Sequence, residues 1–148
     1  MPVLYERRAF LHMPNHKIED VEGIGKAIGA QLREAGIADT DTLLASAKTP
    51  AQRKALAEAS GVPETQILKF ANMVDLYRVH GVGSEFGELL EAAGVDTVPE
   101  LAKRNPETLA KRLAALNQEQ DLVRHVPQAS SVTRWVEHAK TLSRMIEY

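Results

Sequence analysis

The chain contains no cysteine, which excludes disulfide bonds and thiolate metal sites. Phe, Trp and Tyr make up only 5% of the 148 residues, so a core must be built mainly from Leu, Ile, Val and Ala. Apolar runs are only a few residues long, too short for a membrane-spanning helix. No apolar signal segment follows the N-terminus. We therefore expect a cytoplasmic protein that does not enter a membrane.

The chain also lacks a large excess of either positive or negative charge. The chain has 18 Lys and Arg residues against 20 Asp and Glu residues, a net charge of -2. Proteins that coat nucleic acid through bulk charge are normally basic. Any contact with nucleic acid must therefore be local. The overall composition, 44% hydrophobic and 26% charged, is typical of a folded globular protein.

An internal repeat organises the chain. At an offset of 58 residues, the segment that begins at Ile18 aligns with the segment that begins at Leu76, and the match continues to Leu43 and Leu101. The closing segments match at an offset of 65, which indicates an insertion within 117–130 of the second copy. We therefore divide the chain into an N-terminal arm (1–17), repeat 1 (18–76) and repeat 2 (77–148).

The signals within each copy predict helices. Thr49-Pro50 and Asn105-Pro106 pair an N-cap residue with proline at the first helical position. Apolar residues recur at helical spacing in the closing segment of each copy, and the second of these predicts a helix over 131–146. No segment alternates with the period of a strand. The expected fold class is therefore all-α.

A glycine pattern occurs once in each copy, as Gly23-Ile24-Gly25 and as Gly81-Val82-Gly83. Paired glycines permit a tight turn between two helices, and the apolar residue between them would point into the core. A third glycine, Gly29 or Gly87, lies four residues later and would let the two helices approach closely. The second glycine of each pair would open a helix, whose unpaired amides and dipole favour an anion such as phosphate.

This pattern resembles the helix-hairpin-helix motif of DNA repair and replication proteins. The chain after about residue 18 also resembles the bacterial domain-of-unknown-function family 4332, a family of tandem helix-hairpin-helix repeats. The stretches that carry the resemblance are VEGIG (21–25), LREAGI (32–37), NMVDL (72–76), LLEAAGVDT (89–97), ELAKRNP (100–106) and WVEHAK (135–140). The resemblance implies two fused repeats packed as one pseudo-twofold helical domain of the SAM/helix-hairpin-helix type.

By analogy with DNA-binding hairpins, backbone amides of the two turns would contact phosphates of double-stranded DNA without reading base sequence. The residues placed at that contact are Gly23, Ile24, Gly25, Lys26, Gly81, Val82, Gly83 and Ser84. The acidic residues Glu22 and Glu85 beside the turns do not suit phosphate. A basic face on repeat 2, including Arg78 and His80, would help, although its lysines and arginines fit solvated helix sides as well.

Two functions therefore remain open. One is a non-catalytic, sequence-independent DNA-binding module. The other is a protein-interaction adaptor or oligomerising scaffold in which the turns only shape the fold. No catalytic motif, metal-ligand set or cofactor fingerprint is present, so we expect neither an enzyme nor a cofactor.

Overall fold

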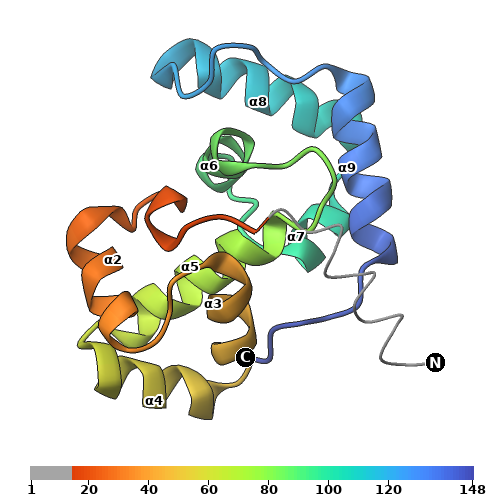
Figure 1. Cartoon of the computed structure of the whole chain (residues 1–148). Helices are drawn as coiled ribbons and strands as arrows, with labels where there is room; N and C mark the ends of the chain where they lie inside the picture. Colours follow the sequence, from red (N-terminus) through yellow and green to blue (C-terminus); the bar gives the residue numbers. More distant parts are fainter. Residues whose placement is uncertain (1–14) are drawn as a thin grey trace.

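The computed structural model describes residues 15–148, and the regular elements in this range are helices (Figure 1). The all-α prediction is confirmed. The one β-type pairing in the described range is an isolated bridge between Lys17 and Asp39. The 3₁₀ helix η1 (Ile18–Asp20) is followed by α2 (Gly25–Glu34), α3 (Thr40–Ser46), α4 (Pro50–Ser60), α5 (Glu64–Leu76), α6 (Ser84–Ala92), α7 (Val98–Lys103), α8 (Pro106–Gln120) and α9 (Ala129–Thr141). The predicted arm lies outside the described residues except for its last three.

Several helix boundaries follow the capping residues that the sequence predicts. The Thr49 hydroxyl accepts the Gln52 amide, and the Gln52 side chain accepts the Thr49 amide in return, which forms a capping box at the start of α4. The Asn105 side chain accepts the Thr108 amide at the start of α8. Gly61 ends α4 in the left-handed conformation, at φ 77°, which a residue with a side chain adopts only with strain.

The insertion in repeat 2 is divided between a helix and a loop. Helix α8 has 15 residues, whereas its counterpart α4 has 11. A loop without regular structure then runs from Asp121 to α9, and the Asn117 side chain binds both backbone groups of Val123 to hold it.

The predicted helix over 131–146 is too long, because α9 ends at Thr141. Residues 142–148 instead extend back to repeat 1, as the C-terminal end of the ribbon shows (Figure 1). Ile146 is only 2% exposed there, and the buried guanidinium of Arg53 donates to the Glu147 carbonyl at 2.7 Å. These tertiary contacts replace the last helical turn.

The apolar residues form two clusters, the first including most of the buried side chains of α5 and the second beginning at its last residue. The first contains residues from Ile18 to Tyr77 together with Ile146, and the second runs from Leu76 to Ala139. Helix α5 lies at the centre of the molecule, with α2, α3 and α4 around its N-terminal half and α6, α7 and α9 around its C-terminal end (Figure 1). Its C-terminal end leads directly into the second glycine turn.

Candidate functional site

The first glycine turn connects η1 to α2. Gly23 has φ 89° and Gly25 has φ 63°, both in the left-handed region that glycine adopts without strain. Ile24 between them is 3% exposed and belongs to the first cluster. The prediction that this residue points inward is confirmed.

The second glycine turn connects α5 to α6 and differs in one backbone angle. Gly81 has φ 91°, but Gly83 is extended, with φ -114° and ψ -161°. Val82 is buried to the same degree as Ile24 and belongs to the second cluster. The two turns thus share an inward apolar residue and a left-handed first glycine.

The first glycine of each turn is backed by an aromatic ring. A Cβ atom placed on Gly23 would lie 3.6 Å from Phe70, and one placed on Gly81 would lie 3.0 Å from Trp135 Nε1. Phe70 and Trp135 are 65 residues apart, the offset at which the closing segments of the two repeats match. Equivalent aromatic residues therefore support equivalent turns.

The third glycine of each pattern permits a close contact, as predicted. A Cβ atom on Gly29 would lie 2.8 Å from the side chain of Glu19 in η1. A Cβ atom on Gly87 would lie 2.7 Å from Met73 Sδ and 3.3 Å from the Tyr77 ring. Glu19 and Tyr77 are separated by the repeat offset of 58. In both repeats, therefore, a neighbouring side chain occupies the space that the missing glycine side chain leaves.

The second glycine of each turn faces open space. No described atom lies within 4 Å of a Cβ placed on Gly25 or on Gly83. Within residues 15–148, the amides of Gly25 and Lys26 donate to no acceptor, as expected at the start of a helix. Lys26 is exposed beside them. The first turn therefore offers free amides and a cation at one point.

Ser84 takes a different position from Lys26. Its hydroxyl donates to the Asp20 carbonyl of η1 at 3.3 Å and accepts the Tyr77 hydroxyl at 3.4 Å. Burial raises the Tyr77 pKa, so this hydroxyl stays protonated as a donor. The start of α6 is thereby held against η1, the element that precedes the first glycine turn.

Acidic side chains gather near this contact. Burial and the nearby carboxylates of Glu22, Glu91 and Glu85 raise the pKa of Glu88. Glu22 and Glu85 are exposed, and Glu91 pairs with Lys69 at 3.1 Å. The potential beside the second turn is therefore negative, which opposes phosphate at that position.

The second turn is also attached to α9. The His80 amide donates to His138 Nδ1 at 2.9 Å, so this nitrogen must be unprotonated to accept the bond. Burial, the charge on His80 and that on Arg78 lower the pKa of His138. The sequence pattern did not single out His138, because the two histidines are 58 residues apart in the chain.

The structure corrects the role considered for Arg78. Its side chain is only 8% exposed, and its Nε donates to Asp75 Oδ1 at 2.6 Å while Nη2 donates to the Ser143 carbonyl at 2.9 Å. Arg78 therefore belongs to a buried ion pair and not to a solvated basic face. The spacing of Asp75 and Arg78, three residues apart, was the available signal.

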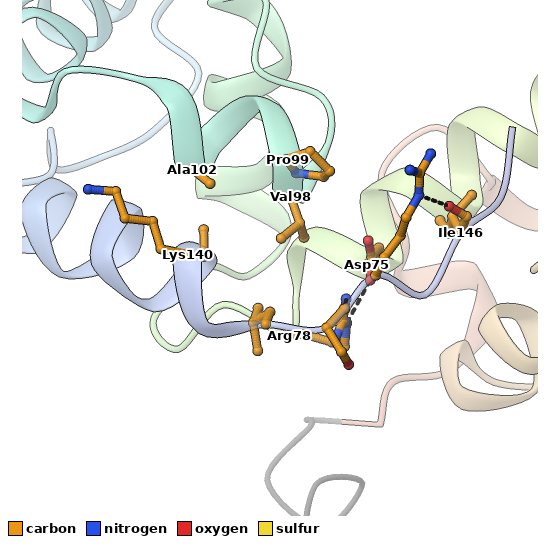
Figure 2. Close-up of a pocket in the computed structure, with 11 residues that line it drawn as sticks. Asp75, Arg78, Val98, Pro99, Ala102, Lys140 and Ile146 are labelled. Atoms are coloured by element: carbon orange, nitrogen blue, oxygen red, sulfur yellow. Dashed lines mark hydrogen bonds and ion pairs between the residues drawn. The ribbon is translucent and has the colours of Figure 1, made fainter.

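This ion pair lines a cavity of about 210 Å³ between α5, α7, α9 and the C-terminal segment (Figure 2).

Among residues 15–148, no cluster of His, Asp or Glu is arranged to hold a metal ion. None of the helices in that range has the length and apolar character required to cross a bilayer.

The sequence was compared with protein-family models, curated proteins and solved structures. The family model described as Domain of unknown function (DUF4332) matches residues 22–142. No curated protein and no solved structure matches the chain. The matched segment includes both glycine turns and all of α2 to α9, well over half of the sequence. The chain therefore belongs to the DUF4332 family.

Proposed function

We propose that the protein is a non-catalytic module that binds double-stranded DNA through the backbone amides of its two glycine turns. The observation that carries this proposal is the open space in front of Gly25 and Gly83, where α2 and α6 begin. A phosphate oxygen approaching this side of either glycine would meet no side chain, and in the first turn the amides of Gly25 and Lys26 are unpaired. Helix N-termini favour such an anion because their amides are unpaired and their dipole is positive.

The two turns would act together. In this proposal the repeats are helix-hairpin-helix units related by a pseudo-twofold axis, with one turn for each DNA strand. The bond from Ser84 to the Asp20 carbonyl supports this arrangement, because it keeps the start of α6 next to the first hairpin. Amide contacts with phosphates do not distinguish bases, so binding would be independent of sequence.

The first turn would contribute more affinity than the second. Lys26 is exposed beside the free amides of the first turn, whereas the equivalent residue of α6 is the uncharged Ser84, which the acidic Glu85 follows. Carboxylates near the second turn repel phosphate at low ionic strength, where they are poorly screened. We therefore expect weak binding that decreases steeply with salt, because each phosphate contact releases counterions.

A charge reversal at the first turn tests the proposal. Lys26→Glu should reduce binding of a duplex about tenfold or more at low salt, since it replaces an attraction by a repulsion at a phosphate. Lys54→Glu changes the net charge by the same amount at an exposed position of α4 and is the matched control. Fluorescence anisotropy with a labelled duplex gives both affinities. Equal losses in the two variants would reject the turn as the binding site.

A second charge change should strengthen binding. Glu85→Lys removes the acidic group next to the open Gly83 and should raise affinity several-fold, whereas Glu107→Lys in the first turn of α8 should have a smaller effect. An unchanged affinity in Glu85→Lys would remove the second turn from the proposal.

The alternative is a protein-interaction adaptor or oligomerising scaffold that does not bind DNA. The acidic group of Glu22, Glu85, Glu88 and Glu91 favours this function, because it would attract a basic protein surface. The same titration separates the two functions. An adaptor should show no binding to duplex, single-stranded or branched DNA even at low salt.

A further inference from the structure

The cavity between the two clusters has an apolar side and a polar end. Val98 and Ala102 of α7 form its upper wall in Figure 2, and Ala139 and Leu142 contribute from α9 and the segment after it. Asp75 and Arg78 close the other end. The cavity has a volume of about 210 Å³ and is partly open to solvent. It therefore suits a small molecule.

The polar end consists of two charged side chains that are more than nine-tenths buried. The Asp75 side chain is 5% exposed and that of Arg78 is 8% exposed. A buried ion pair loses much hydration, which its mutual attraction often fails to restore. Such a pair is therefore weak support for stability and is often associated with a functional site.

Each member of the pair keeps hydrogen-bonding capacity. Asp75 accepts one bond, at Oδ1, so Oδ2 has no partner within residues 15–148. Arg78 donates from Nε and Nη2, and its Nη1 has no acceptor in the same range. The polar end of the cavity thus offers one free acceptor atom and one free donor atom.

The other cations around the cavity are directed elsewhere. Lys140 pairs with Glu137 at 3.2 Å, and its ammonium group extends away from Asp75 and Arg78 (Figure 2). Arg144 donates to the Ile146 carbonyl and lies over the Tyr148 ring. The polar end therefore has no net charge from Asp75 and Arg78, and no further cation converges on it.

We propose that this cavity binds a small neutral molecule with a primary carboxamide head and a short apolar body. The carboxamide oxygen would accept from Arg78 Nη1, and its NH₂ group would donate to Asp75 Oδ2. A carboxylate would meet the like charge of Asp75, and an ammonium group would meet that of Arg78. The apolar body would lie against Val98, Ala102 and Leu142. This site is separate from the glycine turns and does not depend on DNA binding.

The first test compares three probes with the same branched four-carbon skeleton on the full chain: isobutyramide, isobutyrate and isobutylamine. Two-dimensional NMR at constant pH and salt should show saturable shifts of amides in α7 and around Leu142 with isobutyramide. The two charged probes should bind at least about tenfold more weakly, since each meets one like charge of the ion pair. No localised shifts with isobutyramide, or equal affinity for the three probes, would overturn the proposal.

A cavity-filling variant gives the location. Ala102→Leu should weaken isobutyramide binding about tenfold or more by occupying the apolar end. Ala115→Leu makes the same change on the exposed side of α8, outside the cavity lining, and should leave binding unchanged. Equal effects of the two substitutions would exclude the cavity as the site. Their helicity and melting temperatures, measured in parallel, show that both are folded.

The charge of Asp75 supplies the most specific test. In Asp75→Asn the repulsion of a carboxylate is removed while Arg78 stays positive, so isobutyrate should bind more tightly than to the unmodified chain, by about tenfold. Isobutyramide should lose its advantage over isobutyrate in this variant. If the order of the probes is the same in both proteins, the ion pair does not select the head group and the proposal is wrong.

Discussion

The two glycine turns have one sequence pattern but different surroundings. Each has an inward apolar residue, an aromatic ring behind its first glycine and open space before its second. The first turn has a 3₁₀ helix before it and an exposed lysine after it. The second follows the central helix α5, contacts η1 through Ser84 and is attached to α9 through His80. The shared pattern determines the turn, whereas the neighbouring elements determine its accessibility and charge.

Substitution of the third glycine should reveal the largest difference in stability between the two repeats. Gly87→Leu should lower the free energy of unfolding by about 3 kcal/mol, because the added side chain meets Met73 and the Tyr77 ring in a packed region. Gly29→Leu should lower it by only about 1 kcal/mol, since the Glu19 side chain is partly exposed and can move aside with the loss of its surface ion pair to Arg33. Urea denaturation of the two variants gives both values. A larger loss in Gly29→Leu would contradict this interpretation of the contacts.

The C-terminal segment connects repeat 2 to the first cluster. Substitutions in this segment should cause the next largest loss in the free energy of unfolding. Ile146→Ala should lower the free energy of unfolding by about 2 kcal/mol, at the lower limit for such substitutions because an extended segment can adjust. Met145→Ala, beside it but only partly buried, should cost less. Guanidinium denaturation measures the difference. Similar small losses would mean that the segment contributes little to the first cluster.

Removal of the helix caps at equivalent positions of the two repeats should produce a smaller difference in stability. Thr49→Ala removes a reciprocal capping box and should cost about 1 kcal/mol, whereas Asn105→Ala removes a single cap bond and should cost somewhat less. Thermal unfolding of the paired variants tests this order. The reverse order would show that the box adds nothing to the cap.

The smallest effect concerns pH and should be confined to the second turn. The folded chain lowers the His138 pKa below its ordinary value of 6.5, so the unfolded chain binds more protons as pH falls. The contribution of the His138 bond to the free energy of unfolding is therefore fully present above about pH 6.5. It is lost as pH falls from 6.5 through the pKa of His138 in the folded chain. Hydrogen exchange of the His80 amide should accelerate relative to the intrinsic rate over the same range.

The matched control is His138→Gln, whose side-chain oxygen can accept the same bond without titrating in this range. Its His80 amide should show no pH-dependent loss of protection. The first turn has Glu22 at the position equivalent to His80 and should also lack the effect. A pH-dependent loss that persists in His138→Gln would assign the titration to another group.

The sequence predicted most helices because their signals are local. Thr49 and Asn105 contact amides three residues ahead, and Gly61 needs only its own backbone freedom to end α4. The inward position of Ile24 and Val82 also follows from the turn itself. The early end of α9 could not be predicted in this way, because it depends on the contact of Ile146 with the first cluster.

The candidate site was predictable only in part. The eight turn residues were chosen from the pattern, and the structure adds that the sides of Gly25 and Gly83 where a Cβ atom would lie are open. Binding of DNA at these residues stays a prediction. The ion pair of Asp75 and Arg78 was not anticipated, because charged residues at this spacing are usually solvated on a helix surface.

The amino-acid sequence by itself determined the helical class, the repeat and the inward apolar residue of each glycine turn, since these depend on backbone preference and on apolar spacing within short stretches. Only the tertiary structure decided that Ser84 would contact Asp20, that Arg78 would be withdrawn from solvent and that residues 142–148 would return to repeat 1. The physical reason is that burial and electrostatic potential are set by all the elements around a side chain, and those elements are distant in the sequence.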